Sequence, residues 1–402
     1  MLAAGKGSID TRPTLIRMRD VIIVGGGPGG LFAAARLARE GHDVAVVEEH
    51  RAIGQPVHCT GVLAHEALGE LQLPRGVILN SLSTARFHSP SGYHLSYTTP
   101  TTEALVIDRV AFDQQLAGRA AAAGAALISG ARVAAIRIDA DRAELDTHDG
   151  VTMRARAVVL ACGASYVFQR RFGLGMPPVH LNSAQLEVPA TRTGDVEVYF
   201  GSDIAPRGFA WAVPVTRPGG HHVRIGLMCD GDAAAHFRQV LQRLGPSWGV
   251  AADACGSPRR RLLPLAPIPR TYANRLLVIG DAAGLVKATT GGGIYYSIVS
   301  GDIAAEVLAD ALRRDTLAEA ALATYQHRWR ARLMPEFRAQ LAMRMLAQRL
   351  TDAEIDALFE LARTDGIMPI VRRTAEFNRH RKLIIALFKH PPVRRVLFRR
   401  LR

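Results

Sequence analysis

The sequence predicts an α/β protein in which a parallel, helix-covered sheet is interleaved with an antiparallel sheet and followed by helices. Three observations support this prediction. Residues 21–24 are β-branched and lead through a glycine-rich turn into a helix-forming segment, which is typical of a parallel βαβ unit. Apolar and polar residues alternate through much of 185–228, as in antiparallel strands with one solvated face. Beyond Asp302 the pattern is helical to the end of the chain.

The composition of this 402-residue chain excludes several classes of protein. Hydrophobic residues make up 48% and charged residues 21%, so disorder, collagen-like repeats and coiled coil are excluded for most of the length. The apolar stretch over 21–35 is shorter than the roughly 20 residues of a membrane-spanning helix. The cysteines form no CxxC pair, so we expect no disulfide scaffold, no metal site and a cytoplasmic location.

A glycine-rich turn joins the first predicted strand to the first predicted helix. It reads Gly25-Gly26-Gly27-Pro28-Gly29-Gly30 and fits GxGxxG, and Glu48 ends the next strand 18 residues after Gly30. We expect Gly25 to permit the turn, Gly27 to let the backbone approach a pyrophosphate, and Gly30 to let helix and strand pack closely. The N–H groups of the helix N-terminus would bind phosphates, and Glu48 would bind ribose hydroxyls. This pattern predicts a Rossmann-like dinucleotide-binding unit.

Two further segments indicate which dinucleotide is bound. After the predicted strand 276–279 come Gly280-Asp281-Ala282-Ala283-Gly284 and then Thr290-Gly291-Gly292-Gly293-Ile294. A carboxylate at the end of a buried strand, followed by a helix N-terminus, suits the ribityl chain and ring carbonyls of a flavin. Arg109 follows Asp108 at the start of a predicted helix over 108–124, where a diphosphate could use its charge. These features favour FAD over NAD.

Together these residues resemble the geranylgeranyl reductase family, within the larger group of FAD-dependent oxidoreductases that includes aromatic hydroxylases. The resemblance covers residues 20–310 and, less closely, the helical tail. It also rests on Ile53-Gly54-Gln55-Pro56-Val57-His58-Cys59-Thr60-Gly61 and Gly208-Phe209-Ala210-Trp211-Ala212-Val213-Pro214. The sequence departs from the family pattern at Cys162, where many relatives have aspartate, and at Phe209, where tyrosine is usual. After Cys59, Thr60-Gly61 replaces the more common Gly-Glu-Gly.

The resemblance implies an enzyme that saturates carbon–carbon double bonds of an isoprenoid chain by hydride transfer from reduced FAD. It places Cys59 beside the flavin as the candidate catalytic residue, and Phe209, Trp211 and Pro214 around the substrate. The cofactor contacts that we expect are Gly25, Gly27, Gly29, Gly30, Glu48, Arg109, Val133, Gly163, Asp281, Gly292, Gly293 and Ile294. The reductant would be NADPH or a ferredoxin, since the chain holds one dinucleotide fingerprint. On the residues alone, Cys59 is equally a packing residue, and Trp211 fits a strand core.

Two other functions stay open at this stage: an FAD-dependent monooxygenase of an aromatic or polyketide substrate, and a non-catalytic flavin- or lipid-binding membrane module. The predicted organisation begins with a flexible leader over 1–19. It continues with three groups of segments: an FAD-binding domain over 20–53, 104–165 and 270–310, a substrate domain over 54–103 and 166–269, and C-terminal helices over 311–402. Within the FAD-binding domain we expect separate strands over 132–138, 151–156 and 158–160. The sequence does not indicate the oligomeric state.

Most of the net charge of +14 lies at the C-terminal end of the chain. Residues 369–402 contain eleven Lys or Arg residues and one acid, Glu376. Apolar stripes accompany this charge on both sides of Pro391-Pro392: Leu383, Ile384, Leu387 and Phe388, then Val393, Leu397 and Leu401. Such a pattern is typical of a helix lying on an anionic membrane, here the inner face, and equally of a stripe packed on the protein. We expect no nucleic-acid partner, because no aromatic stacking platform accompanies the charge. Arg259-Arg260-Arg261 is interpreted as a solvated turn.

Overall fold

The computed structural model describes residues 17–364 and 366–398. Its largest sheet has eight strands, and the strands in the middle run parallel, as expected of a Rossmann-like unit. Across this sheet the strands are β17 (Tyr272–Ala273), β18 (Leu276–Val278), β11 (Thr152–Leu160), β1 (Met18–Val24), β2 (Val44–Glu48) and β8 (Ala126–Ser129), with β10 (Ala143–Thr147) and β9 (Val133–Ile138) extending from β11.

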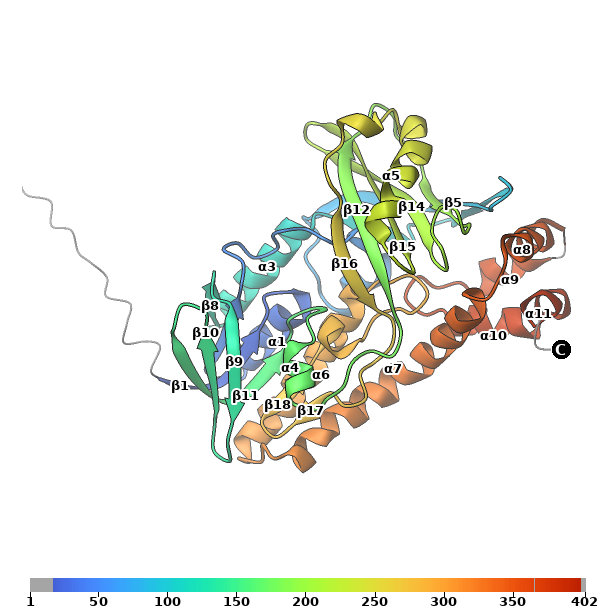
Figure 1. Ribbon diagram of the computed structural model, residues 1–402. Coiled ribbons are helices and arrows are strands. Elements are labelled where there is room, and N and C mark those ends of the chain that lie inside the picture. The colour runs from blue at the N-terminus through green and yellow to red at the C-terminus, as the bar shows by residue number, and fades with distance from the viewer. Residues whose placement is uncertain (1–16, 365, 399–402) are drawn as a thin grey trace, which may run out of the picture.

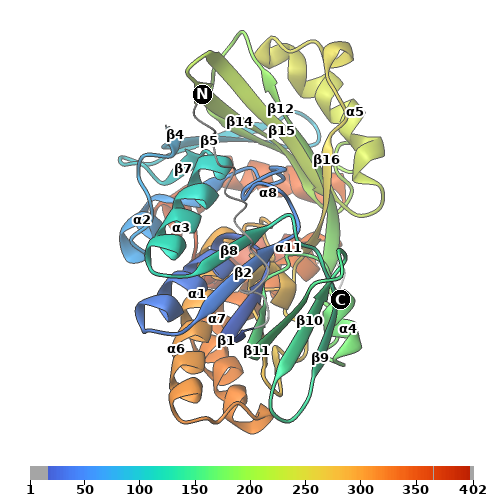
Figure 2. The same cartoon turned by 90° about the vertical axis from the view of Figure 1, so that its left-hand side faces the viewer.

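Helices α1 (Pro28–Arg39), α3 (Arg109–Ala122) and α6 (Ile294–Arg313) pack beside this sheet (Figure 2). α1 begins within the glycine-rich segment 25–30, with Pro28 in the first helical turn, where its missing N–H costs nothing. α3 is capped by Asp108, whose carboxylate accepts hydrogen bonds from the backbone N–H groups of Val110 and Ala111. α1 and α6 approach closely: a Cβ on Gly301 would lie 2.5 Å from the carbonyl oxygen of Gly29.

A second sheet of seven strands lies above the first in Figure 1. Its neighbours are antiparallel except where β13 pairs with β5. Helix α5 (Ala233–Leu244) packs on β12 and β15 and closes a core of its own with them. In order, the strands are β16 (Arg259–Pro264), β12 (His180–Pro189), β15 (Gly220–Cys229), β14 (Phe209–Arg217), β13 (Val196–Tyr199), β5 (Thr84–His88) and β6 (His94–Thr98).

The remaining elements are a small sheet and several short helices. A three-stranded antiparallel sheet consists of β3 (Val62–Ala64), β7 (Ala104–Ile107) and β4 (Ile78–Leu82). The short helices are α2 (His65–Glu70), α4 (Val167–Arg171), η2 (Gly245–Trp248), η3 (Ala252–Ala254) and η4 (Gly280–Ala283). Because several of these lie between elements of the large sheets in sequence, the chain passes back and forth between the two sheets, and the predicted fold class is confirmed.

The C-terminal part of the described chain is helical. α7 (Glu319–Ala347) runs along the molecule from the large sheet to a group of four shorter helices (Figure 1). These are α8 (Asp352–Thr364), α9 (Ile367–Thr374), α10 (Arg381–Lys389) and α11 (Pro391–Leu397). Ile367, Val393 and Leu397 are buried together, and Leu387 and Phe388 pack against them. Up to Phe398, the last residue described, the apolar stripes of the tail therefore face protein, while the cations beside them, such as Arg394 and Arg395, stay exposed.

Several sequence predictions differ from the structure. The segments 151–156 and 158–160 form one strand, β11, because its exposed first half pairs with β10 and its buried second half enters the parallel sheet. The prediction missed β10, whose few residues alternate without a glycine or proline boundary. Met18 and Arg19, expected in the leader, belong to β1; residues 1–16 and Leu401 lie outside the described residues. None of the helices described is long and apolar enough to cross a membrane.

Candidate functional site

The glycine-rich turn lies at the carboxyl edge of the large sheet, between β1 and α1. Gly25 has φ +114°, and a Cβ there would lie 2.4 Å from the carbonyl oxygen of Ala161, at the end of β11. A Cβ on Gly30 would lie 2.4 Å from the carbonyl oxygen of Gly25, so both positions require glycine. Gly27 differs, since no atom lies within 4 Å of a Cβ placed there. The N-terminus of α1 thus opens onto free space, as a pyrophosphate site requires.

Glu48 ends β2 beside this turn and holds it in place. Its Oε2 accepts a hydrogen bond from the Gly26 N–H at 2.8 Å, and its Oε1 accepts one from the His50 N–H at 2.9 Å. The Glu48 side chain stays 14% exposed, and Nδ1 of His50 lies 2.5 Å from the same Oε1, so a ribose would share this carboxylate with His50. The Ala131 N–H donates to the Glu48 carbonyl at 2.9 Å, which brings the start of β9 at Val133 to the same corner.

Asp281 lies on η4, directly after β18, and faces the N-terminus of α6. Its Oδ1 would be 2.6 Å from a Cβ on Gly293, the residue that precedes α6. No described residue donates a hydrogen bond to this carboxylate. Burial raises the pKa of Asp281, although the charges of Arg109 and Arg261 act in the opposite direction. A desolvated carboxylate needs donors, and the hydroxyls of a ribityl chain would supply them, so these residues fit FAD.

Arg109 lies at the start of α3, and other side chains of this protein contact its guanidinium. Its Nη2 and Nε donate to Asp113 at 2.8 and 3.2 Å, and the thiol of Cys59 lies beside the same guanidinium. Burial raises the pKa of Asp113, and Arg109 opposes that rise. The Cys59 Sγ also accepts a hydrogen bond from the Gly61 N–H at 3.3 Å. Arg109 therefore links α3 to the Cys59 loop, in addition to any contact with a diphosphate.

The Cys59 loop also contacts the second sheet. The Thr60 hydroxyl donates to Oε1 of Gln185 on β12 at 2.7 Å. His58 has a buried Nδ1 without a hydrogen-bond partner among the described residues. Burial, helped by the charge of Arg261, lowers the pKa of His58 to about 4, so its ring is neutral at pH 7. The sequence did not indicate that His58 and Arg261 belong to this region. Arg261 was expected in a solvated turn but lies on β16, and His58 was noted only as part of a motif.

Phe209 and Trp211 lie on one face of β14 and contact each other, with ring centroids 5.8 Å apart. Trp211 lies across Gly226 of β15, where a Cβ would be 2.5 Å from the indole ring. The indole N–H is buried and has no partner among the described residues. Strand alternation places Pro214 on the opposite face, together with Ala212. The structure therefore brings Phe209 and Trp211 together but places Pro214 on the other side of the sheet. The resemblance had identified Pro214 by its place in the motif, without regard to the face of the strand.

Two loops at the edge of the large sheet carry the other predicted cofactor contacts. Gly163 follows β11 with φ +61°, and nothing lies within 4 Å of a Cβ placed there. Burial raises the pKa of the neighbouring Cys162 thiol to about 11. Gly292 and Ile294 flank the N-terminus of α6, whose free N–H groups face the same region as Asp281. Gly29, in contrast, serves packing, since a Cβ there would lie 2.3 Å from an α6 side chain.

The loop that leads from η4 to α6 contains a buried lysine, Lys287, which the sequence did not indicate as a site residue. Lys287 is 3% exposed, and a Cβ on Gly292 would lie 2.7 Å from its Cε. Its Nζ donates to the carbonyl oxygen of Phe377 at 2.9 Å, and burial lowers its pKa to about 7. His380 also approaches the Phe377 carbonyl, with its Nε2 at 3.0 Å. The segment between α9 and α10 therefore closes the site from behind.

Comparisons with known proteins agree with this geometry. The model of the pyridine nucleotide-disulphide oxidoreductase family matches residues 19–188. A digeranylgeranylglycerophospholipid reductase of Methanoculleus marisnigri is 31% identical over 350 residues, covering 78% of this chain and 82% of that protein. One of Methanocaldococcus jannaschii is 28% identical and covers 85% and 90%.

Solved structures show the same fold. A geranylgeranyl bacteriochlorophyll reductase-like protein of Thermoplasma acidophilum has a TM-score of 0.81 at 23% identity, covering 96% of this chain and 99% of its own. A probable FAD-dependent monooxygenase of Pseudomonas aeruginosa has a TM-score of 0.62 at 19% identity, covering 86% of this chain and 100% of its own. The structure and the relatives together identify the chain as an enzyme: it belongs to the geranylgeranyl reductase family of FAD-dependent oxidoreductases.

Proposed function

We propose that this enzyme reduces carbon–carbon double bonds of an isoprenoid chain with FAD as its cofactor. The observation that carries the proposal is the apolar wall of Phe209 and Trp211. Trp211 lies over Gly226 next to Gln185, and Gln185 accepts a hydrogen bond from Thr60 of the Cys59 loop. An isoprenoid chain offers only apolar contacts, and an aromatic wall provides them. Relatives named digeranylgeranylglycerophospholipid reductases support the same substrate class.

The residues of the chain would bind the cofactor, orient its ring and shield the substrate side from water. The open N-terminus of α1 at Gly27 would bind the pyrophosphate, while Asp281 and the N-terminus of α6 would orient the ribityl chain and ring. When bound, FAD supplies the hydride chemistry that no side chain offers. Cys59 and the wall of Phe209 and Trp211 would exclude water on the substrate side and fix the position of the alkene.

The electron donor and the membrane contact are further parts of the proposal. NADPH or a ferredoxin would reduce the flavin in a transient encounter. The exposed cations Arg372, Arg394 and Arg395 would meet the anionic inner face of a membrane, where each cation contributes about 1 kcal/mol. Because the apolar stripes are packed in their own cluster, this contact would be electrostatic and sensitive to salt.

Product analysis tests the proposal against the monooxygenase alternative. The FAD-loaded protein is photoreduced without oxygen and mixed with a geranylgeranyl lipid, and in a parallel sample oxygen is admitted. We expect a mass gain of two hydrogens per double bond in the anaerobic sample. A product that forms only with oxygen and gains an oxygen atom would favour the monooxygenase. Flavin that reduces reversibly but transfers electrons to no lipid would favour a binding module.

A further inference from the structure

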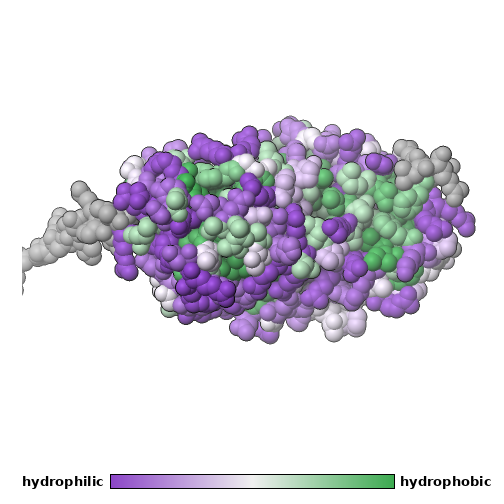
Figure 3. Space-filling view, turned by 90° about the horizontal axis from the view of Figure 1, so that it is seen from below, coloured by the Kyte–Doolittle hydropathy of each residue, from purple (hydrophilic) through white to green (hydrophobic). Residues whose placement is uncertain are grey.

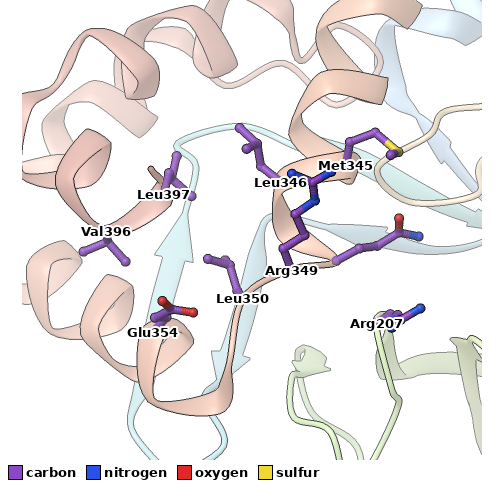
Figure 4. Close-up of a pocket in the computed structure, with 9 residues that line it drawn as sticks. Arg207, Met345, Leu346, Arg349, Leu350, Glu354, Val396 and Leu397 are labelled. Carbon is purple, nitrogen blue, oxygen red and sulfur yellow. The ribbon is translucent and has the colours of Figure 1, made fainter. Parts of the chain in front are cut away.

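A pocket of about 520 Å³ lies at the junction of the C-terminal helices with the second sheet, outside the predicted site residues (Figure 4). Met345, Leu346 and Leu350 line it from the end of α7 and the loop that follows, and Val396 and Leu397 line it from α11. Arg207, in the loop before β14, lies on the side opposite Val396 and Leu397 (Figure 4). In the view from below, apolar surface gathers at this end of the molecule (Figure 3). Met345 is 42% exposed there, so an apolar side chain of the pocket is open to solvent.

Two guanidinium groups and one carboxylate line the pocket, and an anion is favoured only on the side of Arg207 and Arg349. Arg349 is exposed, and no described residue forms an ion pair or hydrogen bond with its guanidinium. Arg207 donates to Asp230 at 3.0 Å and retains further N–H donors. Glu354 also lines the pocket and keeps its negative charge, since the N–H and hydroxyl of Thr351, which donate to it at 2.8 and 2.9 Å, are neutral. It lies on the side of Leu350, away from Arg207 (Figure 4). Apolar walls with guanidinium groups suit an amphiphile that carries phosphate.

The pocket is connected to the loop 284–293, which leads from η4 to α6, through Arg344, which is 5% exposed. Its guanidinium donates to the carbonyl oxygens of Ala288 at 2.8 Å and Thr289 at 2.9 Å, just before the glycine run that leads to α6. It also donates to the carbonyl oxygen of Arg207 at 3.0 Å. Arg344 directly precedes Met345, so one buried side chain joins the wall of the pocket to the loop over the cofactor.

A row of aromatic side chains gives a second connection, from α8 near the pocket to the apolar wall of Phe209 and Trp211. Phe209 lies two residues after Arg207, and its ring centroid is 5.8 Å from that of Trp211. Phe200 extends the row, with its ring centroid 6.1 Å from that of Phe209 and 6.1 Å from that of Phe359 on α8. α8 therefore continues the apolar surface of the second sheet to the side of the molecule where the pocket lies.

We propose that this pocket receives the phosphate-bearing end of the isoprenoid lipid, while the chain extends past Phe209 toward Trp211. This inference rests on the proposed function, because it takes the isoprenoid from there and adds the place of the polar end. The guanidinium of Arg349 binds the phosphate, and Met345 and Leu350 cover the first isoprene units. An isoprenoid without a charged end lacks the Arg349 contact and is held by the apolar walls alone.

Equilibrium binding to the oxidised, FAD-loaded protein tests this inference with three probes: geranylgeranyl diphosphate, geranylgeraniol and inorganic phosphate. We expect Arg349→Gln to weaken binding of the diphosphate about tenfold at low salt and to leave binding of the alcohol unchanged. Arg338→Gln removes an exposed cation from α7 outside the pocket and is the matched control, with wild-type affinity for both. Inorganic phosphate alone should compete weakly, because it lacks the apolar contacts.

A second variant addresses the apolar wall. Met345 is exposed, so tryptophan can be placed there without a buried clash; filling the pocket in Met345→Trp should weaken the diphosphate and the alcohol alike. An Arg349→Gln protein that binds the diphosphate like wild type, or that loses both lipids equally, would overturn the inference. Binding does not require turnover, so a protein that shows this pattern but reduces no lipid contradicts the proposed function and leaves the pocket in place.

Discussion

The replacement of Lys287 by methionine would probe the buried titratable group in the loop 284–293, which leads from η4 to α6. The Lys287 Nζ donates to the Phe377 carbonyl and lies 4.0 Å from the centre of the Phe377 ring. Burial lowers its pKa from the ordinary 10.5 to about 7, although the charges of Glu66 and Glu336 partly oppose this. Methionine keeps an unbranched apolar stem and removes the titrating group.

The magnitude follows from the two pKa values. A fall from 10.5 to about 7 on folding, at about 1.36 kcal/mol per pH unit, costs the folded protein about 5 kcal/mol at or below pH 7. Between pH 7 and 10.5 the unfolded chain binds the proton and the folded chain does not, so wild-type stability rises with pH in this window. Lys287→Met removes that dependence. Its stability gain over wild type should therefore be largest near pH 7 and shrink toward pH 10.

Thermal or denaturant unfolding of both proteins between pH 6 and 10 measures this difference. Burial, together with the charge of Lys287, lowers the pKa of His380 from 6.5 to about 4. His380 therefore adds to the difference only below about pH 7, and the trend from pH 7 to 10 reports Lys287 alone. Lys389→Met, which removes an exposed lysine of α10, is the control and should show no such trend. A stability difference that is constant with pH, or that grows toward pH 10, would refute the argument.

Three other predictions concern the cofactor, the substrate side and the tail. Gly27→Val should fold normally but purify without FAD, because its side chain enters the open pyrophosphate space, whereas Gly30→Val should lower the melting temperature through its contact with the Gly25 carbonyl. Cys59→Ala should retain FAD and the melting temperature but reduce the lipid more slowly. Unchanged kinetics would show that Cys59 is only a packing residue. Arg394→Glu together with Arg395→Glu should reduce co-sedimentation with anionic vesicles, and equal binding to neutral vesicles would count against the membrane contact.

Local backbone signals made much of the fold and cofactor site predictable. Glycine at positions 25 and 30 and the cap at Asp108 report conformations that few other residues allow, so their places followed from the sequence. A carboxylate directly after a buried strand, as at Asp281, also has few alternative explanations. Each of these signals depends on residues close together in the chain.

Contacts between distant segments could not be predicted. The partner of Lys287 is the carbonyl of Phe377, 90 residues away, and nothing in either local sequence indicates that they meet. The amphipathic pattern of α10 and α11 predicts an apolar partner but does not distinguish a bilayer from neighbouring helices, which in the structure are α7 and α9 for α10 and α8 for α11. The pocket at Arg349 likewise depends on how α7, α8 and α11 converge on the second sheet.

Anaerobic stopped-flow mixing of the fully reduced, FAD-loaded protein with a geranylgeranyl lipid tests the central claim most directly. We expect the absorbance of oxidised flavin to return without oxygen, with one flavin reoxidised for each double bond saturated. A flavin that stays reduced in the presence of the lipid, and is reoxidised only when oxygen is admitted, would contradict the assignment of this enzyme as an isoprenoid reductase.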